Sequence, residues 1–431
     1  MARQNHGQNP NQGRAESQGR SGNRGQSQTQ GHNQNQGRGR GRNHSRNQNR
    51  SGNPVVSVIV PTYNRKAILE KCLRALLDQT FPADRYEIVV VDDGSTDGTR
   101  DMVEHLIRQW HGRAPAAGAI GEVHEAAGTA ACPLVYRYRA HTSAAAARNE
   151  GIRAARGVLL IFLDSDIVTR ANFVEAHVKA HINEALREGW RPEEGLGVRG
   201  MPGVPGVLGV PGVPGVPGVR GATSTRAGHD GDDLAGTLDS SKVIVHGRVI
   251  YTTNLDNPTA EPRKVSDISM AFFASGNASI ARRWVVRAGL FDEDFTEYGW
   301  EDLELGKRLK KLGLRVVRSE APTGYHLKHE FRVANLPAIR RREIERGHMA
   351  VLYLKKHPTF GVRMTTMIVP PFFWLVWLLA AGGWPDRPGA ARLLDRLQRR
   401  GHRTLVGVLL QIMVYYWYVQ GIKERLAQAS R

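Results

Sequence analysis

The chain has 431 residues, of which 40% are apolar, so it is long enough to bury a large hydrophobic core. Its formal net charge of +19 predicts an anionic partner, such as nucleic acid, a lipid surface or a phosphorylated substrate. The two cysteines, Cys72 and Cys132, exclude a disulfide framework and are typical of a reducing compartment. The first residues are polar and lack the apolar segment of a secretory signal, so none is expected.

Residues 1–53 are composed almost wholly of Gln, Asn, Gly, Arg and Ser, and their nine Arg and one Glu carry about eight of the nineteen net charges. This composition buries too little apolar surface to offset the entropy of ordering, which predicts a disordered tail. Its Gly-Arg repeat would touch RNA or anionic lipid weakly, although a solvated tail is the better explanation. No other contact with nucleic acid is expected.

Three apolar runs further along the chain each end in polar residues. Because they are rich in β-branched side chains, they predict strands buried on both faces, as in a parallel sheet. The runs are 55–64, 87–95 and 158–166. Helices are expected between and before them, at 65–80, 94–110 and 142–156. The alternation of strand and helix predicts an α/β fold, with Ser95 or Thr96 capping the second helix.

Within residues 195–241, a glycine recurs at every third position from Gly197 to Gly221. The period is that of collagen, but the run is short and a collagen helix needs three chains. A mobile surface loop followed by a linker is therefore preferred to trimerisation. We expect three parts: the tail, an α/β domain over 54–335 that carries this insert, and a helical, membrane-associated region over 336–431.

Two C-terminal segments, Met364–Trp384 and Thr404–Val419, are strongly apolar. The first has the length of a membrane span but contains Pro370 and Pro371, and the second is short and aromatic. With two full spans, the positive-inside rule would put the α/β domain outside, which conflicts with the cysteine content and the missing signal. We expect interfacial or re-entrant helices at the cytoplasmic face of the membrane, with two full spans as the alternative.

Polar clusters stand at the carboxyl ends of all three predicted strands: Pro61–Asn64, Asp92–Ser95 and Asp164–Asp166. Ligands of open α/β sheets bind outside these ends, so the clusters predict one site. Asp164 and Asp166 beside a buried strand would be costly without a partner. They would cap a helix, pair with a buried cation, or bind Mg²⁺ or Mn²⁺, which prefer oxygen ligands.

Six motifs in order make the chain similar to the family 2 glycosyltransferases, whose nucleotide-sugar domain has the GT-A fold. They span residues 55–330, interrupted by the insert. The motifs are 57-SVIVPTYNR-65, 90-VVDDGSTDGT-99, 144-AAAARNEGIRAARG-157, 161-IFLDSDI-167, 275-SGNASIARR-283 and 298-YGWEDLELGKRL-309. The resemblance implies a Rossmann-like, mostly parallel sheet flanked by helices, with the tail and the insert outside it.

The resemblance implies roles for residues that would bind the donor. Pro61 and Tyr63 would line the nucleobase pocket. Asp93 would accept a hydrogen bond from the base, and Asp92 would lie on the ribose. Arg148 would face the diphosphate or the donor sugar. The expected donor is a nucleotide-diphosphate sugar, most simply a UDP-sugar.

The resemblance also implies a divalent ion, Mn²⁺ or Mg²⁺. Asp166 would be the direct ligand, and Asp164 would hold the ribose or a metal-bound water. Members of the family often add a His beyond the catalytic helix, and 324-GYHLKHE-330 offers His326, which we prefer, and His329. An ordinary loop histidine is the alternative for either one.

Glu301 and Asp302 stand at the start of a predicted helix, Trp300–Leu312, which Gly313 ends. By resemblance, Asp302 would be the base that takes the proton of the acceptor hydroxyl, and Glu301 would orient the acceptor. First-turn acids that the helix dipole favours are the alternative. Trp300 would stack on an acceptor sugar, although a core Trp is commoner.

Asn277 lies among small residues that would let the acceptor approach closely, and it would contact the acceptor. The stretch Asn277-Ala278-Ser279 also fits an N-glycosylation sequon, which matters only in a secreted chain.

These features predict a metal-dependent glycosyltransferase of hexosyl or N-acetylhexosaminyl type. Attack assisted by one base predicts inversion, and the acceptor would be a glycan, a glycolipid or a polysaccharide at a membrane surface. The alternative is an RNA- or lipid-associated binding protein with a degenerate sugar-nucleotide domain, but it would have lost Asp166 or Asp302, and both are present. A nucleotidyltransferase would need a Gly-rich loop with Lys near the first strand, where the chain has 61-PTYNR-65.

Overall fold

The computed structural model describes residues 54–111, 132–188, 230–258, 271–328 and 331–429. Backbone contacts divide the chain into Met1–Arg50 and Ser51–Arg431, and every element described below belongs to the second unit. The predicted tail 1–53, the glycine repeat and His329 lie outside the described residues.

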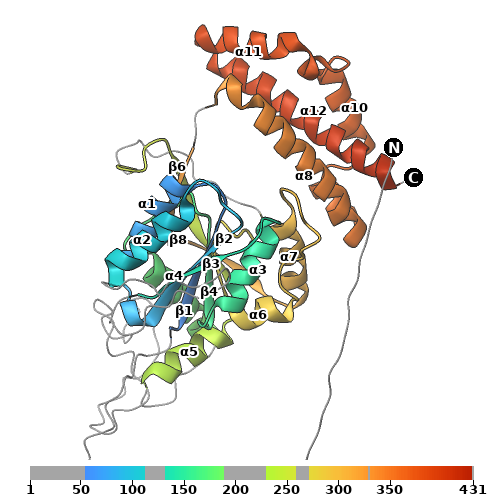
Figure 1. Cartoon of the computed structure of the whole chain (residues 1–431). Helices are drawn as coiled ribbons and strands as arrows, with labels where there is room; N and C mark the ends of the chain where they lie inside the picture. The colour runs from blue at the N-terminus through green and yellow to red at the C-terminus, as the bar shows by residue number, and fades with distance from the viewer. Residues whose placement is uncertain (1–53, 112–131, 189–229, 259–270, 329–330, 430–431) are drawn as a thin grey trace, which may run out of the picture. The chain divides into compact units, whose positions relative to one another are not determined.

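In the described residues, eight strands form one sheet in the order β3-β2-β1-β4-β7-β6-β8-β5 (Figure 1). Its first half is parallel, since β1 lies between β2 and β4 and β2 also pairs with β3. These strands are β1 (Val56–Thr62), β2 (Tyr86–Asp92), β3 (Leu134–Tyr138) and β4 (Leu159–Leu163). The three strands predicted from apolar runs are therefore confirmed, within a few residues at their ends.

The second half of the sheet is mixed. β7 runs antiparallel between β4 and β6, β8 runs parallel to β6, and β5 runs antiparallel to β8. These strands are β5 (Ile167–Thr169), β6 (Val243–Thr252), β7 (Asn277–Ala281) and β8 (Arg315–Leu327). Four of the seven described strand pairs are parallel, which confirms the predicted α/β class.

Helices cover both faces of the sheet, and the alternation of side chains along β1 explains how (Figure 1). Val58 and Val60 pack into a core with α1, α2, α4 and α5, whereas Ile59 packs into a core with α3, α6 and α7. The helices are α1 (Lys66–Leu77), α2 (Thr99–His111), α3 (Ala144–Ala154), α4 (Phe173–Arg187), α5 (Asp230–Ser240), α6 (Arg282–Arg287) and α7 (Glu301–Lys311). Strands β1, β2 and β4 are thus buried on both faces, as their continuous apolar runs predict.

Two local predictions were wrong. Helix α2 begins at Thr99, later than expected, because the carboxylate of Asp97 accepts the Thr99 N–H at 3.1 Å and so acts as the cap. The residues before Ser241 form helix α5 and not a linker. Leu238 of this helix is fully buried in the core beneath β4, and that contact outweighs the weak helix propensity of its Gly and Asp residues.

After β8 the described chain is helical. The helices are α8 (Leu336–Lys356), α9 (Phe360–Thr365), α10 (Pro370–Leu379), α11 (Pro388–Arg399) and α12 (Arg403–Ala429). The apolar segment Met364–Trp384 is interrupted between α9 and α10, because Pro370 and Pro371 open a new helix. The segment Thr404–Val419 lies within α12, which is 27 residues long and so exceeds the short helix expected.

Two stretches, Phe360–Leu379 and Arg403–Gln428, are long and apolar enough to cross a membrane by length and composition. Buried residues make up 28% and 39% of their most apolar windows. A core helix of a soluble protein passes the same test, so the choice between interfacial helices and full spans stays a prediction. The domain boundary at residue 336 coincides with the start of α8 and also stays a prediction.

Gly347 of α8 packs against the backbone of α12, and a Cβ at this position would overlap the carbonyl oxygen of Tyr418. We expect Gly347→Ala to push the two helices apart and lower the free energy of unfolding by about 1–3 kcal/mol. Gly407 of α12 has no atom within 4 Å of its would-be Cβ, so Gly407→Ala should instead add about 0.5–1 kcal/mol. Denaturant unfolding measures both, and the same sign for the two variants would contradict this packing.

Candidate active site

Strand pairing brings Asp166 and His326 together. β5 runs antiparallel to β8, and its first residue, Ile167, lies opposite His326. The Leu327 N–H also donates to the carbonyl oxygen of Asp166, at 3.3 Å. As a result, His326 Nε2 lies 3.1 Å from Asp166 Oδ1, although the two residues are far apart in the sequence.

The cationic side chain of Arg65 also reaches Asp166. The guanidinium of Arg65, in the loop after β1, donates to Asp166 Oδ2. Burial raises the pKa of Asp166, but His326 and Arg65 outweigh burial and leave that pKa below its usual value. Burial lowers the pKa of His326, but the carboxylate of Asp166 outweighs it and leaves that pKa raised. Sequence analysis gave Arg65 no role, and its only signal was its place in the first motif.

The predicted divalent ion fits this pair of side chains. Asp166 Oδ1 is buried and faces His326 Nε2 at 3.1 Å without a well-aligned hydrogen bond among the described residues. Adjacent ligands of an octahedral Mg²⁺ lie about 3 Å apart, close to the 3.1 Å between Asp166 Oδ1 and His326 Nε2. The described residues hold no cluster of three or more His, Cys, Asp or Glu for a metal. Substrate phosphates would have to supply further ligands, as is usual for Mg²⁺.

A buried guanidinium compensates the acidic residues beside this pair. Arg148 of α3 donates to Glu301 Oε1 at 3.0 Å and to Asp164 Oδ1 at 3.5 Å, with a side chain that is only 9% exposed. Burial lowers the pKa of Arg148, but the carboxylates of Asp302, Glu301 and Asp164 outweigh burial and leave the pKa raised. Arg148 was expected to face the donor, and in this structure it joins the end of β4 to the start of α7.

Asp302 is held at one carboxylate oxygen and free at the other. The N–H and the hydroxyl of Ser275 both donate to Asp302 Oδ2, each at 2.9 Å. Oδ1 is buried and has no partner in the described part of the chain, and the same holds for Oε2 of Glu301. Burial raises the pKa of both Asp302 and Glu301. An oriented carboxylate with one free oxygen and a raised pKa suits a general base.

An unusual backbone turn fixes the start of α7. Gly299 and Trp300 have φ angles of +100° and +75°, a region that strains a Trp. The turn is held because Trp300 Nε1 donates to the Arg346 carbonyl of α8 at 2.8 Å, while its ring stacks on Tyr353. One face of the Trp300 ring is therefore occupied within the protein, and its predicted stacking on an acceptor sugar stays a prediction.

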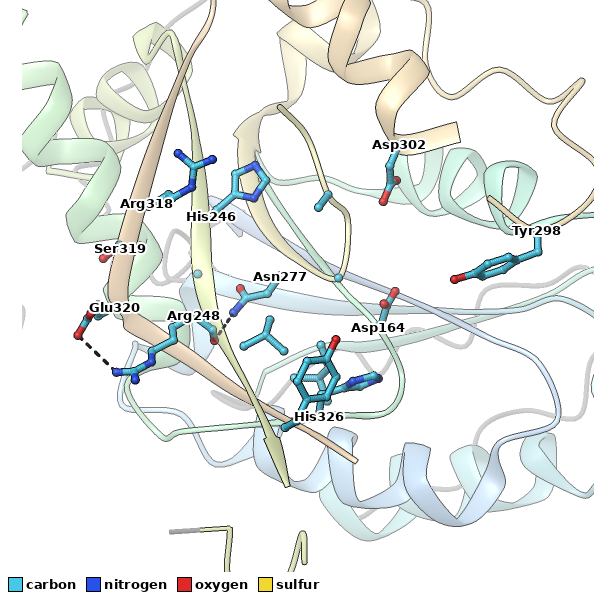
Figure 2. A pocket seen from close by; sticks show the side chains of 16 residues that line it. Asp164, His246, Arg248, Asn277, Tyr298, Asp302, Arg318, Ser319, Glu320 and His326 are labelled. Carbon is cyan, nitrogen blue, oxygen red and sulfur yellow. Dashed lines mark hydrogen bonds and ion pairs between the residues drawn. The ribbon is translucent and has the colours of Figure 1, made fainter. Parts of the chain in front are cut away.

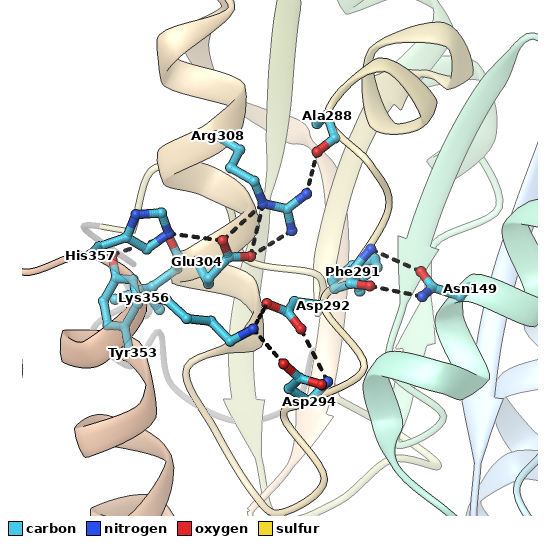
Figure 3. Close-up of polar contacts among 11 residues, drawn as sticks. Asn149, Ala288, Phe291, Asp292, Asp294, Glu304, Arg308, Tyr353, Lys356 and His357 are labelled. Atoms are coloured by element: carbon cyan, nitrogen blue, oxygen red, sulfur yellow. Dashed lines mark hydrogen bonds and ion pairs between the residues drawn. The ribbon is translucent and has the colours of Figure 1, made fainter.

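Polar contacts join α7 and the loop before it to the C-terminal end of α8 (Figure 3). Glu304 of α7 lies 2.9 Å from His357 Nε2, just after α8. Lys356 of α8 binds Asp292 and Asp294 in the loop before α7, each at 2.6 Å. The C-terminal helices therefore hold the helix that carries Asp302.

The predicted nucleobase residues lie at the carboxyl ends of β1 and β2. Pro61 is partly exposed, and Tyr63 is 44% exposed and stacks on His141 with 4.1 Å between the ring centroids. His141 Nδ1 lies 2.8 Å from Asp93, which also accepts from the Thr142 N–H. Burial raises the pKa of Asp93. An exposed aromatic ring next to a carboxylate suits a nucleobase site. Sequence analysis missed His141 because this residue lies outside the six motifs.

Asp92 is placed differently from Asp93. It is fully buried, and its two oxygens accept from the Ser95 N–H at 2.8 Å and the Tyr136 hydroxyl at 2.7 Å. Both contacts are internal, so Asp92 supports the turn that presents Asp93. Its predicted contact with a ribose would require this turn to rearrange.

The side chain of Asn277 ends a chain of buried hydrogen bonds. Its Nδ2 donates to the carbonyl oxygens of Arg248 and Pro322. Its Oδ1 must then accept from Nε2 of His177, 3.0 Å away. With the proton on Nε2, Nδ1 of His177 accepts from the hydroxyl of Ser279 at 2.8 Å. The polar atoms of Asn277 are thus all engaged, and its role toward an acceptor stays a prediction.

The chain of hydrogen bonds continues beyond Ser279. The Ser279 oxygen accepts from Nε2 of His181 at 2.9 Å, and Nδ1 of His181 accepts from the hydroxyl of Ser241 at 2.8 Å. Each donor meets one acceptor, so both histidines are neutral and each has a single tautomer. Burial lowers the pKa of His177 and of His181 to about 3, in agreement with this arrangement. This series of hydrogen bonds connects α4 to β7 beneath the site.

Two cavities meet at Asp164, Tyr298 and Asp302, which line both of them. The larger, about 600 Å³, extends past His326 and over β6 and β8 to Arg248 (Figure 2). The smaller, about 420 Å³, lies between the start of α7 and the C-terminal helices. The free oxygen of Asp302 therefore belongs to a residue that both cavities reach.

The sequence was also compared with known proteins. The model of the family described as Glycosyl transferase family 2 matches residues 57–115 and 124–186, which include Asp166. This match confirms the predicted resemblance to the family 2 glycosyltransferases. A second model, described as the N-terminal domain of galactosyltransferase, matches residues 262–330, which include Asp302. The mixed sheet with helices on both faces is compatible with the GT-A type that the motifs implied.

Several named relatives are similar over much of the chain. YfnE of Bacillus subtilis, named an uncharacterized glycosyltransferase, is 27% identical over 66% of this chain and 67% of its own length. Validoxylamine A glucosyltransferase of Streptomyces hygroscopicus subsp. jinggangensis is 29% identical over 75% of this chain and 64% of its own. Chondroitin synthase of Escherichia coli is 26% identical over 63% of this chain and 34% of its own length. The chain thus spans about two thirds or less of these relatives.

Solved structures are similar to the chain only distantly. Mannosyltransferase PcManGT from Pyrobaculum calidifontis, in complex with GDP-Man and Mn²⁺, has a TM-score of 0.40 and 19% identity, covering 84% of this chain and 86% of that one. TarS of S. aureus, in complex with UDP-GlcNAc, has a TM-score of 0.39 and 16% identity, covering 87% and 92%. At these scores the likeness says nothing about the ligands of this chain.

The buried histidines predict an acid-sensitive fold. Their pKa values are about 3 folded against 6.5 unfolded, so only the unfolded chain takes up their protons between these values. Stability is therefore full above the unfolded pKa and falls toward the folded one, by about 1.4 kcal/mol per pH unit for each histidine. His177→Phe should cost about 2–4 kcal/mol near neutral pH by leaving Ser279 and Asn277 unpaired, and it should flatten the acid slope.

Denaturant unfolding over a pH series measures both effects, with His105→Phe on the exposed face of α2 as the control. That control should stay within about 0.5 kcal/mol of the parent chain. If the stability of His177→Phe fell with decreasing pH as steeply as that of the parent chain, the assignment of His177 as a neutral, hydrogen-bonded histidine would be wrong.

Proposed function

We propose that the protein is a metal-dependent, inverting glycosyltransferase that moves a sugar from a nucleotide-diphosphate sugar to an acceptor hydroxyl. The observation that carries this proposal is the oriented carboxylate of Asp302, whose Oδ1 is free among the described residues. It belongs to the wall of the cavity that also contains His326, the neighbour of Asp166. Relatives named as a glucosyltransferase, a chondroitin synthase and a hyaluronan synthase support sugar transfer.

The donor would lie along the carboxyl ends of β1, β2 and β4. Tyr63 would take the nucleobase beside Asp93, and the diphosphate would reach Asp166 and His326. A divalent ion, Mn²⁺ or Mg²⁺, would stabilise there the negative charge that develops on the departing diphosphate. We propose a UDP-sugar as the donor, with a hexose or an N-acetylhexosamine.

Asp302 would act on the acceptor. Ser275 holds Asp302 Oδ2, which leaves Oδ1 to take the proton from the acceptor hydroxyl as its oxygen bonds to the anomeric carbon. Glu301 would orient the acceptor, and Arg148 offsets the charge of these buried acids. Because one base assists direct attack opposite the leaving group, an α-linked donor would give a β-linked product.

The acceptor is proposed to be a glycan, a glycolipid or a growing polysaccharide, met at the cytoplasmic face of the membrane. The two long apolar stretches, Phe360–Leu379 and Arg403–Gln428, support membrane association.

Asp302→Asn keeps the shape of the side chain but removes the base, so we expect the rate of transfer to fall by about 10²–10⁴-fold. Asp166→Ala removes the proposed metal ligand, so the metal concentration needed for half-maximal rate should rise by more than about 100-fold. Release of nucleoside diphosphate from UDP-glucose, UDP-N-acetylglucosamine, UDP-glucuronate and GDP-mannose, with Mn²⁺ or Mg²⁺ titrated, measures both and identifies the donor.

Asp101→Asn, on the exposed face of α2, is the matched control and should behave as the parent chain. Full activity in either test variant would remove the role assigned to that residue. If the parent chain turned over none of these donors, the proposed function as a whole would be contradicted.

Ser275→Ala removes one of the two hydrogen bonds that favour the ionised form of Asp302. Burial already raises the pKa of Asp302, and this loss should raise that pKa further. Because the base must be ionised, activity is present above this pKa and is lost as pH falls through it. The acid limb of kcat/KM against pH should therefore move up in Ser275→Ala and stay in place in Ser240→Ala, on α5. An unmoved limb would exclude Asp302 as the titrating base.

A further inference from the structure

The smaller cavity has an apolar wall that the transfer reaction by itself does not require. Asp302 and Glu301 stand at one side of it, at the start of α7. The other side is formed by side chains from α9, α10, α12 and the break between α9 and α10. These are Thr365, Met367, Phe372, Tyr415 and Tyr418. Arg346 of α8 also lines the cavity, with its guanidinium over the ring of Tyr418. The cavity thus combines carboxylates from α7 with mainly apolar side chains from α9, α10 and α12, which is the polarity of an amphiphilic ligand.

The apolar wall continues onto the surface of the protein. Phe372 lies on α10, and the next residues of that helix expose large apolar side chains to solvent. Trp374, Leu375, Trp377, Leu378 and Leu379 are between 46% and 64% exposed. A contiguous apolar surface of this kind marks a site of interaction with a protein or a membrane, and exposed Trp is typical of a membrane–water interface.

Charge next to this surface favours a membrane. The segment from Pro385 to Arg403, which follows α10 and includes α11, holds six exposed Arg and two Asp. The arginines are Arg387, Arg392, Arg396, Arg399, Arg400 and Arg403. Apolar side chains beside a cluster of cations bind the headgroups and the outer acyl chains of an anionic lipid surface.

We propose that the smaller cavity binds a lipid-borne acceptor, a sugar carried on a hydrocarbon chain that lies in an anionic membrane surface. The α10 surface and the arginines would hold the protein on the lipid, the chain would lie along Met367, Phe372 and Tyr415, and the sugar hydroxyl would reach Asp302 Oδ1. The inference rests on the proposed function and narrows its acceptor to a lipid-linked class.

The side chains of this wall favour a hydrocarbon chain over a second sugar as the ligand of the smaller cavity. Tyr415 meets Phe372 edge to face with 5.6 Å between ring centroids, and Met367 lies next to them in the break between α9 and α10. These side chains offer hydrocarbon surface and few hydrogen-bonding groups, so hydroxyl groups of a second sugar would lose water there without replacement. Methylene groups, by contrast, gain about 0.8 kcal/mol each from burial.

The test compares two acceptors that carry the same sugar and differ only in the length of the attached hydrocarbon chain. Dodecyl glycosides and methyl glycosides of the same sugars are supplied with phosphatidylglycerol vesicles and a donor that the enzyme turns over. We expect kcat/KM to favour the dodecyl acceptor by more than about tenfold, the effect of burying roughly two methylene groups. Tyr415→Ala and Met367→Ala should reduce this preference about fivefold or more, mainly through KM.

Leu405→Ala is the matched control, since Leu405 is 46% exposed against 39% for Met367 but lies outside the cavity on α12. It should keep the full preference. The ratio of the two acceptors cancels any general damage, because a poorly folded variant loses both activities equally. A parent enzyme that uses both acceptors equally, or cavity variants that keep the preference, would overturn the proposal.

A second measurement needs no knowledge of the acceptor sugar. A dodecyl glucoside with a diazirine on its chain is photolysed with the full-length protein, and the labelled residues are found by mass spectrometry. Labels are expected on Met367, Phe372 and Tyr415 and should fall in Tyr415→Ala; labels elsewhere only would overturn the proposal. Release of nucleoside diphosphate by the parent chain separates the two failures, since its absence removes the proposed function and its presence leaves only the lipid acceptor in question.

Discussion

The structure of the site depends on one buried positive charge, the guanidinium of Arg148. Three carboxylates surround it, those of Asp164, Glu301 and Asp302, which raise its pKa although it is almost fully buried. Removing one partner of such a buried group leaves charges uncompensated, at a cost of about 3–5 kcal/mol. Arg148 comes from α3, and its partners come from the end of β4 and the start of α7. One side chain thus joins α3, the end of β4 and the start of α7.

The C-terminal helices take part in the same arrangement. Trp300 adopts a strained, left-handed backbone conformation directly before Glu301, and its indole is held by the Arg346 carbonyl of α8. Lys356 adds ion pairs to the loop before α7, and His357 lies within hydrogen-bond distance of Glu304 on α7 (Figure 3). The position of Asp302 therefore depends on how α8 packs, and α8 packs on α12 through Gly347. A protein held on a membrane by α10 and α11 would orient its base through this connected set of helices.

Sequence patterns predict those strands, helices and motifs that depend on residues close together in the chain. Strands β1, β2 and β4 and helices α1, α3 and α7 followed from apolar runs and helical spacing. The closeness of Asp166 to His326 followed from a resemblance that the β5–β8 pairing explains. What the sequence could not provide depends on contacts between distant segments. The partners of Arg148, the engaged amide of Asn277 and the buried Leu238 of α5 all arise from tertiary packing. Each follows a rule of burial and pairing that applies only once the neighbours are known.

The two cavities that meet at Asp302 also bear on the choice between transfer and hydrolysis. In the proposed reaction the donor sugar and the acceptor approach from different sides, as direct displacement requires. Water is the competing acceptor, because the free Oδ1 of Asp302 would take a proton from water as readily as from a sugar hydroxyl. An acceptor whose chain fills the space along Met367, Phe372 and Tyr415 would exclude that water, so the apolar wall would contribute to choosing the acceptor as well as to binding it.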